Sequence, residues 1–287
     1  MWGVKVGDAS GSWNELLEGA SFRKGLKLPY EERIKILDKE VPLLDEKSTI
    51  TDDSVFSYAV IVTLLNSGTY EENYRKYGIK ELNIGFDKRG IPAFGSEVSK
   101  WLLENRIGEQ KNSYGNGASM RVSPIGYFYD DIEKIKHEVR RSCEPTHNNE
   151  EAIECAEMVA IATHLSKKGY SQLDIKKYLL KNYNYKFDYD LDYLRKNHIF
   201  NTRSSITIPI ALSVFFQSED FEDGVRNAIS IGGDTDTYAS IVGALFESFR
   251  GIPEELYEEI QEYTPEYMKD DINKFYGICG GPKLIKK

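Results

Sequence analysis

The 287-residue sequence has few cysteines, no long apolar run and no excess of positive charge. Its three cysteines, Cys143, Cys155 and Cys279, are scattered, which argues against a disulfide framework or a cysteine-based zinc site and fits a reducing compartment. No run of about 18 apolar residues predicts a membrane-spanning helix. The first residues, 1–5, lack the pattern of a secretory signal. We therefore expect a cytoplasmic protein.

The charge balance is acidic, with 37 Lys and Arg against 46 Asp and Glu and a net charge of −9. This balance argues against broad binding to nucleic acid or to anionic membranes, although a local basic pocket for a phosphate-bearing ligand remains compatible with it. The hydrophobic fraction of 40% is that of an ordinary globular protein. Strand patterns, internal repeats and linkers are not evident, so we expect a single all-α domain over residues 1–287.

The most informative stretch places Asp234, Asp236 and Thr237 directly after a Gly232-Gly233 break. Apolar residues recur at helical spacing before the break, and the segment after it is apolar on more than one face, which predicts a buried helix. Capping a helix needs one polar residue rather than three. Capping and metal binding are therefore both open interpretations, since hard cations such as Mg²⁺ prefer oxygen ligands.

A second cluster of the same form is Thr51-Asp52-Asp53-Ser54. The following apolar positions predict an amphipathic helix with Thr51 at its N-cap and two carboxylates in its first turn. Two such helix ends would create a pocket of at least four carboxylates, which cannot all stay ionised without cations. A paired-metal site would resolve the repulsion and would suit hydrolysis of a phosphate-rich or glycosidic substrate.

Three further features carry weaker signals. Asp8 and Glu15 are two helical turns apart and could share one face, which on its own favours a solvated acidic face. Gly115-Asn116-Gly117 could expose backbone N–H groups to an anion at a helix start, although a tight turn is the alternative. Arg121 could contact a phosphate.

Several segments of the coarse helix assignment can be tested directly. We expect residues 16–48 to be loop with one short helix near 30–37, and residues 183–200 to be a surface insertion. Glu144 to Glu151 should form a turn with a capping box from Asn148 to Glu151. Pro209 should lie in the first turn of its helix. Residues 85–93 are expected to be loop, and the other expected helices are 70–79, 97–103, 131–141, 152–167, 171–181, 204–216, 254–263 and 266–276.

Four motifs stand together in one order: Gly7-Asp8-Ala9-x-Gly11-x-x-x-Glu15, Thr51-Asp52-Asp53-Ser54, Gly115-Asn116-Gly117-Ala118-x-Met120-Arg121-x-x-Pro124-Ile125-Gly126, and Gly232-Gly233-Asp234-Thr235-Asp236-Thr237. Together they resemble the ADP-ribosylglycohydrolase family, which includes dinitrogenase-reductase-activating glycohydrolase. The resemblance spans Gly3 to about Pro253, and Thr146-His147 also matches family positions. Ser54 stands where the family has threonine and keeps the hydroxyl. The short N-terminal segment resembles that of a compact bacterial or phage-type subgroup.

The resemblance implies an all-helical, monomeric domain with two Mg²⁺ (or Mn²⁺) ions in a central cleft. By motif, Thr51, Asp52 and Asp53 would hold one ion, Asp234 and Thr237 the other, and Asp236 would bridge both. It also implies catalytic roles among Glu15, Asp52 and Asp53. The residues implied to line the diphosphate and ribose are Gly115, Asn116, Gly117 and Ser119, with His147 close by.

The implied reaction is hydrolysis at C1″ of ADP-ribose, releasing ADP-ribose from a protein side chain, a nucleic acid or a small molecule. Phe94, Tyr114 and Tyr127 are candidates to stack on the adenine, from position alone. Residues 85–96 or 183–203 would set acceptor specificity. A non-catalytic ADP-ribose-binding relative is an alternative, although it should have lost metal ligands that are present here. A metal-dependent phosphatase fits less well, because its Asp-x-Asp motif should follow a strand rather than Gly-Gly.

Overall fold

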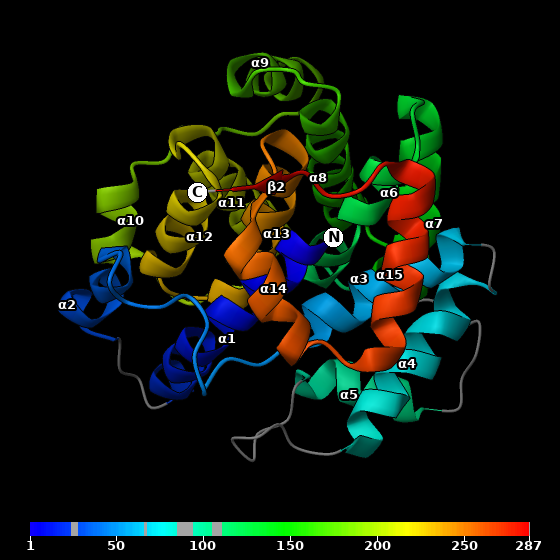
Figure 1. Cartoon of the computed structure of the whole chain (residues 1–287), viewed down its shortest axis with the longest axis horizontal. Helices are drawn as coiled ribbons and strands as arrows, with labels where there is room; N and C mark the ends of the chain where they lie inside the picture. Colours follow the sequence, from blue (N-terminus) through cyan, green and yellow to red (C-terminus); the bar gives the residue numbers. More distant parts are fainter. Residues whose placement is uncertain (24–27, 66–67, 85–93, 105–110, 287) are drawn as a thin grey trace.

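The computed structural model describes residues 1–23, 28–65, 68–84, 94–104 and 111–286, and side chains outside residues 18–23 and 83–84 in these ranges (Figure 1). Its described residues are mostly helical, which confirms the predicted all-α class. Two-residue strands β1 and β2 pair in parallel, with Ile252 opposite Leu284. The elements are α1 (Trp2–Arg23), α2 (Tyr30–Arg33), η1 (Ile34–Leu37), α3 (Asp52–Leu64), α4 (Tyr70–Ile84), α5 (Ser96–Leu103), η2 (Asn116–Arg121), α6 (Ser123–Phe128), α7 (Ile132–His147), α8 (Glu150–Lys167), α9 (Gln172–Asn182), α10 (Leu191–Asn197), α11 (Ser204–Gln217), α12 (Phe221–Ser230), α13 (Thr235–Phe249), β1 (Ile252–Pro253), α14 (Glu254–Tyr263), α15 (Glu266–Cys279) and β2 (Leu284–Ile285).

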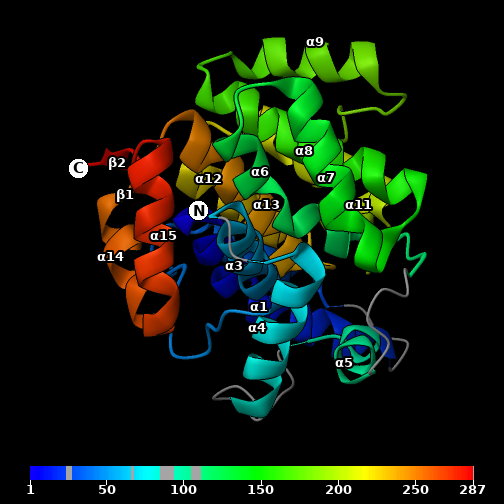
Figure 2. The ribbon, with the colours of Figure 1, turned by 90° about the vertical axis from the view of Figure 1, so that its right-hand side faces the viewer.

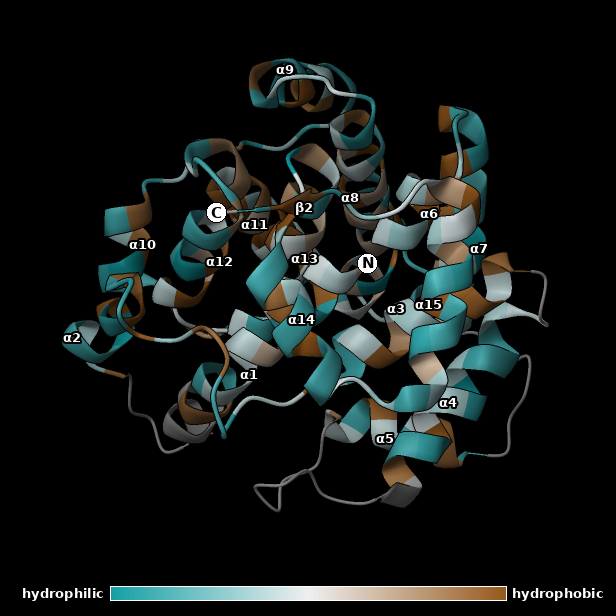
Figure 3. Ribbon diagram, viewed as in Figure 1, coloured by the Kyte–Doolittle hydropathy of each residue, from teal (hydrophilic) through white to brown (hydrophobic). Residues whose placement is uncertain are grey.

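Helix α13 is the centre of the molecule, as predicted for the segment after the Gly232-Gly233 break. Every residue from Thr235 to Ser248 is buried. Helices α8 and α11 are also largely buried, and the described buried hydrophobic side chains form one connected core that includes Cys155. Figure 3 shows many hydrophilic residues on the visible faces of the outer helices α14 and α15. None of the helices in the described ranges is both long and apolar enough to cross a bilayer.

A glycine seam lets α1 lie against the backbone of α13. Gly3, Gly7 and Gly11 recur every four residues and therefore share one face of α1. A Cβ atom built at Gly7 would lie 2.0 Å from the carbonyl oxygen of Ala239, and one at Gly11 would lie 2.4 Å from that of Thr235. Because only glycine fits these positions, the two helices can approach at backbone distance. Both Figure 1 and Figure 2 show α1 beside α13 in the interior, with α9 at one edge.

The first correction concerns residues 16–48, which were expected to be loop with one short helix. Helix α1 continues through this segment to Arg23, while the expected short helix is present as α2 and η1. The sequence after Leu16 and Leu17 hid the continuation, because Gly19 and Ser21 are weaker helix formers and interrupt the apolar pattern.

The expected turn from Glu144 to Glu151 is also wrong in part. Helix α7 runs on to His147 with Pro145 inside it, and Cys143 and His147, one turn apart, are both buried. The N-cap of α8 is Asn149, whose side chain accepts from the backbone N–H of Glu151 at 3.1 Å, so the predicted capping box does not form.

Residues 183–200 are not simply a surface insertion. The segment contains α10, and its Phe187, Leu194 and His198 side chains are buried. These side chains give the segment apolar anchors that its many Tyr and Asp residues obscure. Pro209 lies in the second turn of α11 rather than the first, because α11 begins at Ser204.

Candidate functional site

The four sequence motifs meet at one cavity of about 840 Å³. Its walls come from α1, α3, α5, η2, the end of α7 and the start of α13. A cavity of this size accommodates a nucleotide-sized ligand. Phe56, Phe94 and Trp101 are apolar members of the lining, and its acidic members near the helix starts are Asp52, Asp53, Asp234 and Asp236.

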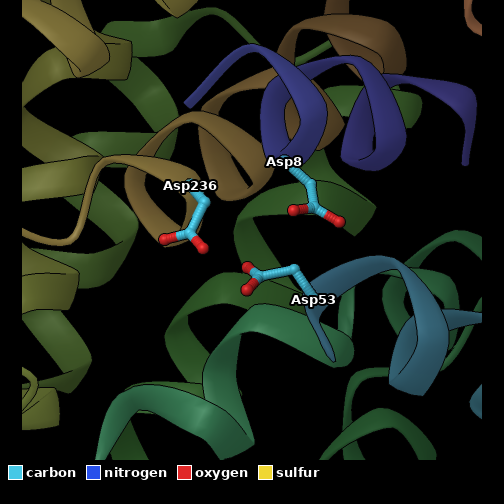
Figure 4. Close-up of side chains that lie close together, drawn as sticks. All are labelled: Asp8, Asp53 and Asp236. Carbon is cyan, nitrogen blue, oxygen red and sulfur yellow. The ribbon is translucent and has the colours of Figure 1, made fainter. Parts of the chain in front are cut away.

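Three aspartates from three helices converge beside the cavity, and two of them, Asp53 and Asp236, are among its lining residues. Asp8 of α1, Asp53 of α3 and Asp236 of α13 each offer a carboxylate oxygen within 4.8 Å of the others. Figure 4 shows the three side chains directed toward a common space between their helices. All three are at most 6% exposed. Such a set of close, buried oxygen donors can hold a hard divalent cation.

Asp8 fixes the start of α3. Its Oδ2 accepts from the backbone N–H groups of Thr51 (2.9 Å) and Ser54 (3.0 Å), and its Oδ1 accepts from the Thr51 hydroxyl (2.8 Å). Thr51 does occupy the predicted N-cap position, but its own side chain makes no cap hydrogen bond. The expectation of a solvated acidic face is therefore wrong for Asp8, which is fully buried and caps a neighbouring helix.

The two predicted acidic clusters are linked by hydroxyl groups. Asp53 accepts from the hydroxyl of Ser240 at 2.5 Å and from that of Thr237 at 3.4 Å. The Thr51 hydroxyl also lies 3.4 Å from Asp236 Oδ2. These contacts join the start of α3 to the first turns of α13, so both helix ends face one site.

Asn116 links the glycine-rich motif to the same site. Its side-chain amide donates to Asp234 Oδ2 at 2.5 Å. Asp234 occupies the N-cap position of α13 without a side-chain cap hydrogen bond, so its carboxylate is available to the cavity wall. Gly115 and Gly117 line the cavity as well, whereas Ser119 is fully buried and is not among its described lining residues.

Burial raises the pKa of each aspartate in the cluster. Burial is the largest cause for Asp8, Asp53, Asp234 and Asp236, with neighbouring carboxylates adding to the effect at Asp53 and Asp236. Burial and the nearby Asp8 raise the pKa of Asp52 to about 7. Crowded carboxylates with raised pKa values bind either protons or cations.

Glu15 lies two helical turns after Asp8 on α1 and lines the cavity. Its negative charge helps to raise the pKa of Asp236. His147 lines the cavity from the end of α7. Burial and the Arg121 charge lower the pKa of His147 to about 3, so its ring is neutral. Arg121 lines the cavity too, and its contact with a phosphate stays a prediction.

The three aromatic candidates for adenine stacking occupy different places. Phe94 lines the cavity, and Tyr114 is 54% exposed next to the lining residue Gly115. Tyr127 is buried against Phe275 and Tyr276 and is not among the described lining residues.

The two expected specificity segments contribute differently to the cavity. Residues 94–96 of the first segment line it, while residues 85–93, the expected loop, lie outside the described residues. The second segment, 183–203, is described throughout, and its Phe200 and Thr202 line the cavity.

Sequence reasoning missed two contributions to this site. Asp8 was not among the predicted metal ligands, although Gly3, Gly7 and Gly11 at four-residue spacing signal a tightly packed helix that would bury it. The hydroxyl of Ser240 was also missed, and its position one turn after Asp236 is the signal that could have found it.

A family model described as ADP-ribosylglycohydrolase matches residues 1–282. ADP-ribosylhydrolase ARH3 from Homo sapiens is 23% identical over 279 residues, which cover 77% of this chain and 76% of that protein. An uncharacterized protein from Archaeoglobus fulgidus is 28% identical over 180 residues, covering 56% of this chain and 58% of its own length. The ARH3 of Gallus gallus is 29% identical over 134 residues, covering 43% and 36%. These matched regions thus span about a third to three quarters of the relatives' lengths.

A solved structure described as an ADP-ribosylglycohydrolase-related protein complex has the same fold. The TM-score is 0.65 at 21% identity, and the superposition covers 96% of this chain and 95% of that one.

Proposed function

Because the chain belongs to the ADP-ribosylglycohydrolase family, we propose that it hydrolyses the C1″ bond of ADP-ribose and releases ADP-ribose from a modified acceptor. The convergence of Asp8, Asp53 and Asp236 beside a nucleotide-sized cavity, which Asp53 and Asp236 line, carries this proposal. The relatives named ADP-ribosylhydrolase support it.

The proposal includes two divalent cations, Mg²⁺ or Mn²⁺. The donor set fits them, because buried carboxylates and hydroxyls crowd together with raised pKa values and need positive charge. When bound, the ions would act as Lewis acids that orient ribose hydroxyls and activate a water. Asp8 would position Thr51 and share in the negative charge. The proposed ligands are Thr51, Asp52, Asp53, Asp234, Asp236 and Thr237.

Proton transfer is assigned to the carboxylates Glu15, Asp52 and Asp53. All three line the cavity. A pKa near 7 at Asp52, in the cation-free protein, supports a group that can hold or release a proton at neutral pH. Cleavage of a glycosidic bond passes through an oxocarbenium-like transition state, and a nearby carboxylate stabilises that positive charge.

The diphosphate and ribose are assigned to the cavity wall formed by Gly115, Asn116, Gly117 and His147. Glycines at this wall let a ligand approach the backbone closely. The Asn116 amide that donates to Asp234 couples this wall to the acidic centre. Ser119, fully buried behind this wall, is assigned a supporting role rather than direct contact.

The test is release of ADP-ribose from arginine-, serine- and DNA-linked substrates, with Mg²⁺ and with EDTA. We compare wild type with Asp236→Asn and with the control Asp188→Asn, an exposed carboxylate outside the cavity lining. Metal-dependent release that is lost only in Asp236→Asn supports the proposal and identifies the acceptor. Tight ADP-ribose binding without any release would favour the binding-only alternative, and the absence of both would refute the proposed activity.

A further inference from the structure

Three side chains in the cavity lining form a hydrogen-bonded row. Arg121 Nη2 donates to the Thr146 hydroxyl at 2.7 Å, and that hydroxyl lies 2.7 Å from His147 Nδ1. Arg121 is itself fixed, because the same nitrogen donates to the carbonyl oxygen of Ser142 at 2.8 Å and the guanidinium lies 4.1 Å from the Tyr74 ring centroid. The row therefore starts from a positively charged guanidinium whose position is fixed by these contacts.

The direction of each hydrogen bond follows from counting protons. An arginine guanidinium can only donate, so the Thr146 oxygen accepts from Arg121. The Thr146 oxygen carries one proton and keeps a second lone pair, and among the described residues His147 Nδ1 is the one acceptor within reach of that proton, so the bond is oriented from Thr146 to Nδ1. A neutral imidazole that accepts at Nδ1 carries its own proton on Nε2. The buried position of His147 and the Arg121 charge keep the ring neutral and lower its pKa to about 3.

The Nε2 edge of the ring faces the glycine-rich motif. A Cβ built at Gly117 would lie 3.3 Å from Nε2, and one at Gly115 would lie 3.7 Å from it. His147 lines the cavity, and within the described part of the chain no hydrogen bond to its Nε2 is formed. This nitrogen is therefore a fixed donor at the cavity wall with room for an acceptor from a ligand.

We infer that Arg121 and Thr146 are positioning residues that lock His147 in its Nε2–H tautomer, as a donor to an oxygen of the bound substrate. The tautomer rests on the hydrogen bonds of Thr146 within the protein. The identity of the acceptor, a phosphate or ribose oxygen of an ADP-ribosyl group, rests on the proposed function. Gly115 and Gly117 place no side chain over Nε2, so this Arg121–Thr146–His147 relay presents one N–H donor to the cavity.

The tautomer is tested by long-range ¹H–¹⁵N correlation NMR on the ligand-free protein at neutral pH. Its two ring nitrogens resonate in well-separated regions according to which one is protonated. The sequence has four histidines, and His147 is assigned by the signals that His147→Gln removes. We expect a protonated Nε2 and a bare Nδ1 in wild type, a mixture of tautomers in Thr146→Val, and recovery of the wild-type pattern in Thr146→Ser. A protonated Nδ1 in wild type, or an unchanged spectrum in Thr146→Val, would overturn the relay.

The hydrogen bond from His147 Nε2 to the substrate is tested with ADP-ribose as the probe, by calorimetry and by steady-state kinetics. Loss of the fixed donor in Thr146→Val should weaken ADP-ribose binding by about threefold to tenfold and raise KM more than it lowers kcat. Thr146→Ser should bind like wild type, which a merely structural role for the methyl group would not explain. Unchanged affinity in Thr146→Val would show that Nε2 does not contact the ligand.

The two hypotheses fail separately. If the NMR pattern is as expected but wild type does not bind ADP-ribose, the relay stands and the proposed function is refuted. If ADP-ribose binds but His147 has the other tautomer, the proposed function stands and the relay is refuted.

Discussion

Gly7 is the position where one added methyl group should damage both the fold and the site. In Gly7→Ala the new Cβ would lie 2.0 Å from the carbonyl oxygen of Ala239 and 2.2 Å from its carbon. Real Cβ atoms essentially never approach closer than 3.0 Å, so α1 and α13 must separate by about 1 Å. The obstacle is backbone of a buried helix, which cannot rotate away as a side chain would.

The expected cost is about 3 kcal/mol or more, at the upper end of overpacking in a closely packed core. A control substitution is available in Gly277→Ala, because Gly277 is an exposed helical glycine with nothing within 4 Å of an added Cβ. That change should instead stabilise the protein by ~0.5–1 kcal/mol, as alanine favours a helix over glycine. The two variants add the same methyl group, and we expect opposite signs for the change in the free energy of unfolding.

The assay is urea unfolding followed by circular dichroism, with the midpoint and slope measured for wild type, Gly7→Ala and Gly277→Ala. ADP-ribose release should also fall by about 100-fold in Gly7→Ala, because displacing α1 by about 1 Å moves Asp8 away from Asp236. Equal stability of Gly7→Ala and wild type would refute the close contact of α1 with α13. A stability loss without a loss of activity would refute the coupling of this contact to the site.

Three further predictions concern charge. Asp236→Asn should lose metal-dependent release, yet in EDTA its melting temperature should exceed that of wild type by ~2 °C or more, because asparagine is neutral without the proton that the buried carboxyl, with its raised pKa, must take up on folding. In EDTA, the free energy of unfolding of the wild type should fall as pH rises from about 4 to about 7. The reason is that Asp52, whose pKa is raised to about 7 in the folded protein, still binds a proton that the unfolded chain has released. Calorimetric scans across this pH range, with and without Mg²⁺, measure the effect. Arg33→Met should cost ~2 kcal/mol in urea unfolding, because Arg33 donates to the carbonyl oxygens of Arg195, His198 and Ile231, whereas the exposed control Lys35→Met should change stability by less than ~0.5 kcal/mol.

Two helix starts were predictable from the local sequence. Thr51 stands at the N-cap position of α3, although Asp8 of α1 makes the capping hydrogen bonds, and Gly232-Gly233 before α13 have the positive φ that favours glycine. The placement of four carboxylates at two helix ends was predictable for the same reason. That these two ends face each other could come only from the family resemblance, since nothing local relates residue 53 to residue 236.

The elements that were predicted wrongly are those whose burial depends on distant partners. Helix α10 is tied to the molecule by His198, whose Nε2 lies 2.9 Å from the Tyr238 hydroxyl, and by the Arg33 guanidinium beneath it. Neither contact leaves a periodic pattern in residues 183–200. Asp8 was misjudged in the same way, because an acidic residue on a short helical pattern resembles a solvated face until the helix is known to be surrounded.

The glycine seam and the acidic centre are two results of one arrangement. A helix with larger side chains at positions 3, 7 and 11 would stand off from α13, and Asp8 would then be unable to cap α3 and face Asp236 together. Bringing these carboxylates into the interior costs free energy, as their raised pKa values indicate, and only tight backbone packing on both sides can hold them there. Without cations, the crowded carboxylates therefore destabilise the folded protein. Because the cations bind the folded site, their binding should raise the free energy of unfolding, and folding and cation affinity are thermodynamically linked.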